Sequence, residues 1–273
     1  MELGMNKKIL ITGATDGIGF ETAKMLLAQG HTVLLHGRNA QKLNKVHTLL
    51  NNDYPQASTQ TYVADLSEMA QVLNLAKQIT ADHKHLDVLI NNAGVFKLDN
   101  PETADGLDAR FAVNTLAPYL LTTLLLPLFD TQGRIVNVSS AAQATVNLDA
   151  LIGQSFLSDN AAYAQSKLAI TMWSRHMGLK LKGNGPLVVS VNPKSLLGSK
   201  MVKDAYGLNG GDLKLGADIF CRAALSDEFS NSTGLYFDND AECFSAPHAD
   251  ALNDAKNQQL IDALDLKLLQ LAI

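Results

Sequence analysis

Tyr163 and Lys167 stand four residues apart in the stretch YAQSK, and together they could do acid–base chemistry. At helical spacing the two side chains share one face of a helix. A tyrosine with its ordinary pKa of about 10 is a poor acid–base catalyst at neutral pH, but a nearby positive charge stabilises the phenolate and lowers the pKa. A packed tyrosine beside a lysine that extends to solvent would give the same spacing. The pair therefore predicts a catalytic phenol only if other residues support it.

Two further polar stretches follow apolar, strand-like runs. Ser140 ends the run GRIVNVSS, where its hydroxyl would be available to the carbonyl oxygen of a substrate, and NNAG at 91–94 ends the run LDVLINNAG. The carboxyl ends of parallel strands meet at one edge of an α/β sheet, and ligands bind at that edge. We therefore expect these residues to converge with Tyr163 on one site.

The stretch ITGATDGIGF at 11–20 places Gly13, Gly17 and Gly19 between an apolar run and a helical pattern. Glycine lets the backbone turn sharply and lets a bulky group approach closely, and a helix that starts there offers unpaired N–H groups and the positive end of its dipole. A pyrophosphate suits that combination. The pattern predicts a nucleotide site, with a merely structural turn as the alternative.

The end of the second strand-like run, HGRN at 36–39, bears on which nucleotide binds. An NAD site usually offers a carboxylate here to the ribose hydroxyls, whereas a 2′-phosphate is attracted by arginine. Arg38 therefore favours NADP(H) over NAD(H). A solvated surface arginine is the alternative, and Asp16 in the glycine loop adds a charge that does not help a phosphate.

Seven strand-like runs alternate with segments of helical spacing, which indicates a doubly wound α/β fold of mainly parallel strands. The chain of 273 residues shows no repeat, low-complexity tract or linker, so we expect a single Rossmann-type domain over residues 1–273. Two stretches, at about 141–160 and 194–216, follow strands on the ligand side and are predicted to shape the substrate site. The seven runs are KKILITG, HTVLLHG, TQTYVAD, LDVLINN, GRIVNVS, PLVVSVN and TGLYFDN.

Composition excludes several function classes. A formal net charge of −5 with no basic block argues against nucleic acid or an anionic membrane surface as the main partner. Cys221 and Cys243 are too few for a disulfide framework. His83 and His85 are better explained by a solvated loop than as metal ligands. We expect a small-molecule partner and no metal.

The N-terminal stretch MELGMNKKILITG ends in a strand-length apolar run and a glycine without a cleavage site, which argues against a secretory signal. The longest apolar run, at 120–129, contains Pro127 and falls short of the roughly 20 residues that a membrane span needs. We therefore expect a cytoplasmic protein with no membrane span.

In their order and spacing these motifs resemble the short-chain dehydrogenase/reductase family over nearly the whole chain. FAVNTLAPYLLT at 111–122 and the C-terminal YFDND with Pro247-His248 are similar to the branch of retinol dehydrogenases and protochlorophyllide reductases. The resemblance implies an NADP(H)-dependent oxidoreductase acting on a carbonyl or alcohol. The matching segments are TGATDGIG at 12–19, Asp65, NNAG at 91–94, Asn114, Ser140, YAQSK at 163–167 and Asn192-Pro193.

The resemblance also implies roles for individual residues. Tyr163 would exchange a proton with the substrate oxygen, and Ser140 would hydrogen-bond that oxygen. Lys167 would lower the pKa of Tyr163 and bind the nicotinamide ribose, while Asn114 would position a water that relays protons to Lys167.

The cofactor contacts transfer in the same way. Asp65 and Leu66 are expected at the adenine, and Asn91 at the adenosine ribose. Pro193 and Leu196 are expected at the nicotinamide amide. The full set expected to contact NADP(H) is Gly13, Thr15, Asp16, Gly17, Ile18, Gly19, Arg38, Asp65, Leu66, Asn91, Ala93, Gly94, Tyr163, Lys167, Pro193 and Leu196.

The chain departs from the family pattern in two places. Lys194 stands where the family usually has glycine after the late proline, so the nicotinamide-side loop is expected to shift. Ser140 and Tyr163 are separated by 22 residues, which implies an insertion at 141–160. Its apolar residues predict either a wall for a lipophilic substrate or an anchor to the core.

The terminal segment 260–273 has apolar residues at helical spacing and must be buried. Packing on its own subunit is the default, and covering the substrate mouth or a neighbouring subunit is the alternative. Family members commonly pair through the helices that here carry Asn114 and Tyr163, so the resemblance implies a homodimer or homotetramer.

Two other functions compete with the oxidoreductase. A non-catalytic NADP-binding regulatory protein would be expected to lack part of the set Asn114, Ser140, Tyr163 and Lys167, which is intact here. A sugar-nucleotide epimerase normally carries a larger C-terminal substrate domain, for which this chain has little length to spare.

Overall fold

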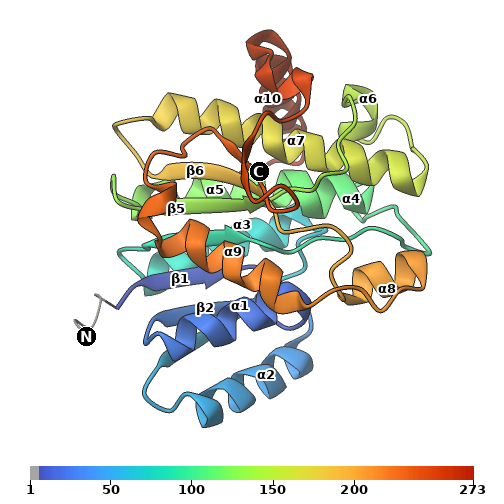
Figure 1. The fold of residues 1–273 in the computed structure, drawn as a ribbon. Coiled ribbons are helices and arrows are strands. Elements are labelled where there is room, and N and C mark those ends of the chain that lie inside the picture. The colour runs from blue at the N-terminus through green and yellow to red at the C-terminus, as the bar shows by residue number, and fades with distance from the viewer. Residues whose placement is uncertain (1–5) are drawn as a thin grey trace.

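A single eight-stranded sheet forms the centre of the computed structural model, which describes residues 6–273 (Figure 1). The strand order is β3-β2-β1-β4-β5-β6-β7-β8, and every pairing is parallel except that of β7 with β8. The start of the N-terminal stretch discussed above lies outside the described residues. The strands are β1 (Lys8–Ile11), β2 (Thr32–Gly37), β3 (Ser58–Val63), β4 (Val88–Asn91), β5 (Arg134–Val138), β6 (Leu187–Asn192), β7 (Tyr236–Asp238) and β8 (Cys243–Ser245).

The doubly wound α/β prediction is confirmed, with one strand more than expected. The additional strand, β8, is a three-residue edge strand that pairs antiparallel with β7. Only Phe244 in it is a large apolar residue, and 37% of that residue is exposed, so a pattern based on apolar runs misses the strand.

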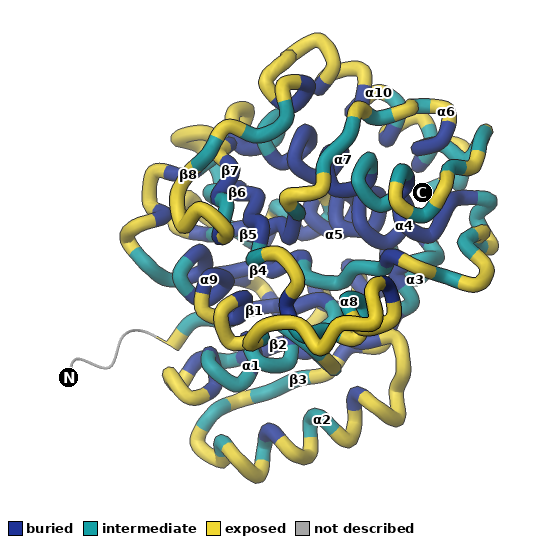
Figure 2. The backbone as a smooth tube through the Cα atoms, turned by 45° about the vertical axis from the view of Figure 1, so that its right-hand side comes forward, coloured by how far each residue is buried: buried dark blue, intermediate teal, exposed yellow. Residues whose placement is uncertain are grey.

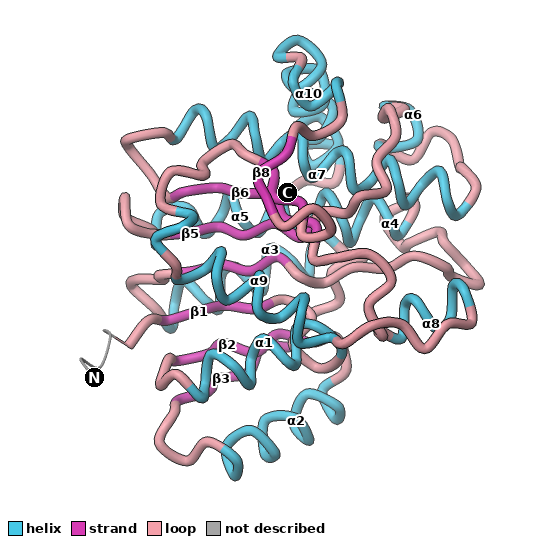
Figure 3. Tube along the Cα trace, in the orientation of Figure 1, coloured by secondary structure: helices cyan, strands magenta, loops and turns pink. Residues whose placement is uncertain are grey.

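Helices cover both faces of the sheet, as the views coloured by chain order and by secondary structure show (Figures 1 and 3). One core packs β-sheet residues against α1, α2 and α9, and the other packs them against α3, α5, α7 and α10. The strands are apolar on both faces because both faces are buried. The helices are α1 (Gly17–Ala28), α2 (Ala40–Asp53), α3 (Met69–Asp82), α4 (Ala109–Phe111), α5 (Ala117–Leu125), α6 (Leu148–Leu151), α7 (Asp159–Leu181), α8 (Lys200–Tyr206), α9 (Leu213–Leu225) and α10 (Asp254–Gln270).

The helical run Ala109–Leu128, which joins α4 to α5, is long and apolar enough to cross a membrane by length and composition alone. Its best window has a mean hydropathy of 1.5, and 78% of that window is buried inside the fold. A π-helical segment, Ala112–Leu116, interrupts the run. π-bulges of this kind are frequent at functional sites.

The C-terminal helix α10 packs on its own subunit, which was the first of the two expectations for segment 260–273. Leu260, Leu264 and Leu268 lie in the same core as Trp173 of α7, and the Tyr119 hydroxyl of α5 donates to Asp265 of α10 at 2.7 Å. Residues 166–174 of α7 are all buried, and Figure 2 shows this helix and α5 among the buried parts of the chain. Helix α10 therefore covers α7 and reaches α5, and the pairing of subunits through the helices that carry Asn114 and Tyr163 stays a prediction.

The insertion at 141–160 forms α6 and connecting loops. Leu151 is fully buried, and Val146, Leu148 and Leu157 pack against the core. These contacts match the alternative in which the apolar residues anchor the insertion. Phe156 differs from them, because 49% of it is exposed.

Candidate active site

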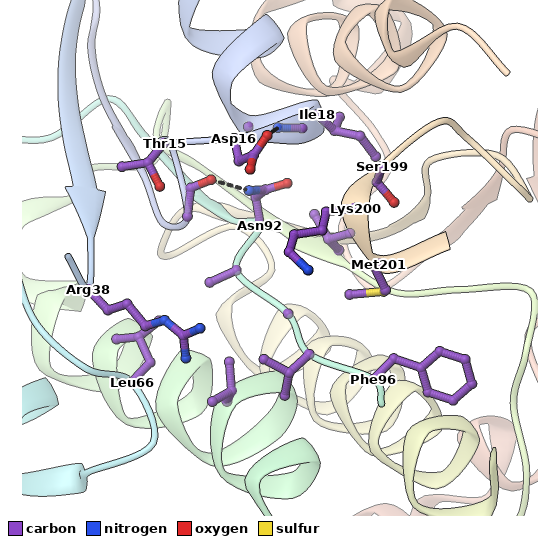
Figure 4. A pocket seen from close by; sticks show the side chains of 18 of the residues that line it. Thr15, Asp16, Ile18, Arg38, Leu66, Asn92, Phe96, Ser199, Lys200 and Met201 are labelled. Atoms are coloured by element: carbon purple, nitrogen blue, oxygen red, sulfur yellow. Dashed lines mark hydrogen bonds between the residues drawn. The ribbon is translucent and has the colours of Figure 1, made fainter. Parts of the chain in front are cut away.

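A cavity of about 690 Å³ opens at the carboxyl edge of the sheet (Figure 4). It runs from the glycine loop and the end of β2 to Tyr163 and Lys167. Every residue expected to contact a dinucleotide lines it except Asn91 and Leu196. The sequence motifs, although far apart along the chain, therefore meet around one space large enough for a cofactor and a substrate.

The glycine loop is shaped so that side chains would not fit in it. Gly13 has φ = +68°, and a Cβ built on it would lie 2.9 Å from Ala93 Cα. A Cβ on Gly19 would lie 2.4 Å from Asn92 Nδ2, which donates to the Thr12 and Gly13 carbonyls at 2.8 and 3.1 Å. The loop therefore brings bare backbone and the N-terminus of α1 to the cavity, which fits a pyrophosphate.

His36 ties the glycine loop to the sheet, a role that the sequence analysis missed. Its Nδ1 accepts from the Gly13 N–H at 3.2 Å, and its Nε2 donates to the Ala64 carbonyl at 3.0 Å. This pair of bonds requires the neutral ring. Burial lowers the pKa of His36 to about 4, against a weaker raising effect of the bond to Ala64. The sequence signal was a histidine directly before Gly37, in a strand that is otherwise apolar.

We expect His36 to make the fold acid-sensitive. Its pKa is lower in the folded protein than in the unfolded chain, so its contribution to the free energy of unfolding is complete above pH 6.5 and is lost as the pH falls toward 4. Over that window the loss should reach about 3 kcal/mol. Urea unfolding of wild type and His36→Gln at several pH values checks this, since the variant should flatten that part of the profile. Parallel profiles would contradict it.

A cationic pair stands at the adenosine end of the cavity. Arg38 is exposed at the end of β2 and makes no ion pair among residues 6–273. Lys42, which the sequence analysis missed, lines the cavity beside it and pairs with Asp16 at 2.6 Å. The bond to Lys42 lowers the pKa of Asp16, which also caps α1 by accepting from the Gly17 N–H at 2.8 Å. Lys42 thus neutralises the carboxylate that seemed unfavourable for a phosphate.

Two of the residues expected to contact the cofactor, Asn91 and Leu196, do not line the cavity. The Asn91 side chain is buried and donates to Thr122 Oγ1 at 3.0 Å and Asn137 Oδ1 at 2.7 Å, so it braces β4 against β5 and α5 instead of facing the cavity. The neighbouring Asn92 lines the cavity. Leu196 is 51% exposed and lies outside the lining, whereas Pro193 lies within it.

Lys194 has φ = +115°, a region that favours glycine. Its Nζ lies 3.7 Å from Glu242 Oε1. The loop that follows β6 therefore keeps the backbone conformation of a glycine while carrying a lysine, at a strain cost of about 1–3 kcal/mol.

The chemical end of the cavity holds Tyr163 and Lys167. Lys167 Nζ is buried, donates to the Val138 carbonyl at 2.8 Å and lies 5.8 Å from the centroid of the Tyr163 ring. Burial lowers the pKa of Lys167 to about 8, so the group is positively charged at pH 7. Asn114 approaches from the π-helical segment, where its Nδ2 donates to Val95 O and Ser166 Oγ, both at 3.0 Å.

The structure corrects the expectation that Lys167 lowers the pKa of Tyr163. Burial raises that pKa, a hydrogen bond with the Ser140 hydroxyl lowers it, and the nearby Tyr206 raises it further, with a net rise. Lys167 is not among the causes of this shift, and its ammonium group donates to the Val138 carbonyl. Ser140 is close enough to bond Tyr163 although it is not part of the cavity lining.

A buried ion cluster holds the elements of this end together. Arg110, fully buried in α4, donates to Asp108 at 2.8 and 2.6 Å and to Asp159 in the first turn of α7. It also lies 3.5 Å from the Phe96 carbonyl. Burial alone would lower the pKa of Arg110, but the bonds to both aspartates raise it. Arg110 therefore connects the segments that carry Asn114, Tyr163 and Phe96.

The lining also includes apolar side chains, one of which packs against Tyr163. Phe96, Leu98, Val113 and Met201 line the cavity, and the Phe96 ring lies 4.5 Å from that of Tyr163 and 5.9 Å from that of Tyr206, measured between centroids. The loop at 194–216 contributes to the lining through Ser199 and α8, whereas no residue of the insertion at 141–160 lines the cavity.

Comparisons with known proteins agree with this arrangement. Residues 7–206 match the family model described as short chain dehydrogenase. The chain is 38% identical to human retinol dehydrogenase 11 over 191 residues, which cover 68% of this chain and 60% of that protein. It is 32% identical to retinol dehydrogenase 12 of Bos taurus over 89% of this chain and 81% of that one.

Among solved structures, a short chain dehydrogenase from Escherichia coli CFT073, complexed with NADPH, matches with a TM-score of 0.71. It is 25% identical, and the match covers 88% of this chain and 99% of that one. The sequence, the sheet topology and the position of the cavity agree on one assignment. The chain belongs to the short-chain dehydrogenase family, in the branch of the retinol dehydrogenases.

Proposed function

We propose that the protein is an NADP(H)-dependent oxidoreductase that interconverts a carbonyl compound and an alcohol, with Tyr163 as the acid or base. The observation that carries the proposal is the single cavity that joins the glycine loop to Tyr163 and Lys167. The non-catalytic alternative is not favoured, because Asn114, Ser140, Tyr163 and Lys167 are all present: Tyr163 and Lys167 line the cavity, Ser140 bonds Tyr163, and Asn114 bonds Ser166 of the same helix.

The choice of NADP(H) has two supports. The similar structure from E. coli holds NADPH, and Arg38 and Lys42 place two cations at the adenosine end of the cavity. When bound, the cofactor supplies or accepts a hydride. The protein then has to orient the substrate oxygen and move one proton.

Each residue at the chemical end has one task. Tyr163 donates its phenolic proton to the substrate oxygen in the reducing direction, and Ser140 hydrogen-bonds the same oxygen. Burial raises the pKa of Tyr163, which keeps the phenol in the protonated form that carbonyl reduction uses. Lys167 holds a positive charge beneath the ring, and Asn114 fixes the loop at Val95.

The substrate is proposed to be lipophilic. The support is the apolar part of the cavity lining, in which Phe96 packs against Tyr163 and the loop at 194–216 contributes Met201. The other apolar residues of the lining named above are Leu98 and Val113. Any shaping of the site by the insertion at 141–160 is indirect, through the position of α7.

The cytoplasmic location stays a prediction.

The cofactor choice gives a direct prediction for Arg38. Replacing Arg38 with Leu should weaken NADPH binding by about tenfold to a hundredfold, the value of a charge-assisted bond to a phosphate, and leave NADH binding within about twofold. Fluorescence titration with both nucleotides measures this. Lys45→Met, which changes an exposed lysine of α2 outside the cavity, is the matched control. An unchanged preference for NADPH would remove Arg38 from the phosphate site.

The proposed function is tested by following NADPH oxidation with a panel of lipophilic ketones and aldehydes. Turnover by the wild-type protein supports the proposal. Tight NADPH binding without turnover of any member would favour the regulatory alternative.

A further inference from the structure

Positive charge gathers around the cavity although the chain as a whole is acidic. The formal net charge is −5, yet the lining holds more lysine and arginine residues than aspartates. Such a surface attracts an anionic ligand. The cationic residues of the lining are Arg38, Lys42, Lys97, Lys167 and Lys200.

Four of these cations have positions that are already explained. Arg38 and Lys42 lie at the adenosine end, where β2 passes into α2. Lys97 and Lys167 donate to the carbonyls of Ala205 and Val138, each at 2.8 Å. Lys200 is the first residue of α8. It is the remaining cation of the lining, and the sequence motifs do not predict which part of the cofactor it contacts.

Lys200 lies at the start of α8, beside the glycine loop. A Cβ built on Gly17 would lie 3.9 Å from the Cβ of Ser199, the residue before Lys200. The charge of Lys200 also contributes to lowering the pKa of Asp16. Figure 4 shows the Lys200 side chain inside the cavity, between Asn92 and Met201. The Lys200 side chain therefore lies in the same cavity as the backbone that fits a pyrophosphate, and its ammonium group is paired with Asp204.

The present partner of Lys200 is replaceable. Its Nζ forms an ion pair with Asp204, one turn further along α8, and the two side chains are 74% and 50% exposed. An exposed pair of this kind contributes little to stability. At the other end of α8, Lys97 donates to the Ala205 carbonyl at 2.8 Å.

We infer that Lys200 binds the pyrophosphate of NADP(H) and that Asp204 competes with the pyrophosphate for it. This inference rests on the proposed function. It assigns Lys200 to the part of the cofactor that NADPH and NADH share, in contrast to Arg38, whose partner is the 2′-phosphate that only NADPH carries.

The test is the dissociation constant of NADPH and of NADH, measured by nicotinamide fluorescence, for three variants. Lys200→Met should raise both constants by about tenfold, because it removes one charge-assisted contact. Asp204→Asn should lower both by about twofold to threefold, because it frees the lysine. Lys203→Met is the matched control on the same helix and should change neither, since Lys203 is exposed and outside the cavity.

Three results would overturn the inference. Unchanged constants for Lys200→Met would remove Lys200 from the cofactor site while leaving the proposed function intact. If Lys200→Met weakened the binding of NADPH but not of NADH, Lys200 would contact the 2′-phosphate and not the pyrophosphate. Failure of the wild-type protein to bind either nucleotide would overturn the proposed function together with the inference.

Discussion

Replacing Tyr163 with Phe should lower kcat/KM for carbonyl reduction by about 10²–10⁴-fold, the usual contribution of a positioned general acid. The substitution removes one hydroxyl and keeps the ring that packs 4.5 Å from Phe96, so the cavity should retain its shape. The dissociation constant of NADPH should therefore change by less than about twofold. Steady-state kinetics and fluorescence titration of the same preparations measure the two quantities.

A matched control for that variant is Tyr236→Phe. Tyr236 is a buried tyrosine on β7 whose hydroxyl bonds the Ser140 carbonyl at 3.2 Å, so its removal disturbs the neighbourhood without touching the reacting oxygen. We expect a much smaller loss of kcat/KM in this variant. Equal activity of Tyr163→Phe and wild type would refute the role of Tyr163 as the acid.

Replacing Arg110 with Met should destabilise the protein by about 3–5 kcal/mol. The variant leaves the buried Asp108 without its cationic partner, and its carboxylate is only 2% exposed. Removing one member of a buried ion pair costs more than the pair contributes, because an uncompensated charge stays in a medium of low dielectric constant. Urea unfolding followed by circular dichroism gives the free energy difference.

Two variants place that result in context. Arg222→Met removes the arginine of an ion pair with Glu228 at 2.7 Å on the surface, where both side chains are partly exposed, and should cost less than about 1 kcal/mol. The double variant Arg110→Met with Asp108→Leu removes both charges and should recover much of the loss. A cost for Arg110→Met no larger than that for Arg222→Met would contradict the reading of Arg110 as a buried anchor.

The fold could be predicted largely from the sequence because its strands are buried on both faces. Runs such as KILI and VLIN are apolar throughout, which is typical of parallel strands between two helical layers. The edge strand β8 could not be found in this way. It is held by backbone hydrogen bonds to β7, and these do not require an apolar run in the sequence. The sequence also could not show which surface α10 packs against. An apolar stripe on a helix predicts that the helix is buried but does not identify the element that buries it.

At the site, sequence motifs located the cavity but did not fix the direction of each side chain. In NNAG the first asparagine points into the sheet and the second to the cavity, as expected for neighbouring residues where a strand ends. The roles of His36 and Lys42 depend on contacts with Gly13 and Asp16 across separate elements. The pKa of Tyr163 depends on burial, which the spacing of YAQSK does not reveal.

The most direct test of the account is the fate of the transferable hydrogen of NADPH. With deuterium at that position of the nicotinamide, and a lipophilic ketone or aldehyde identified in the panel, the alcohol product should carry one deuterium on the former carbonyl carbon, as read by mass spectrometry. Tyr163→Phe should form this product at a rate reduced by about 10²–10⁴-fold. An alcohol without deuterium, formed while NADPH is oxidised, would contradict the account.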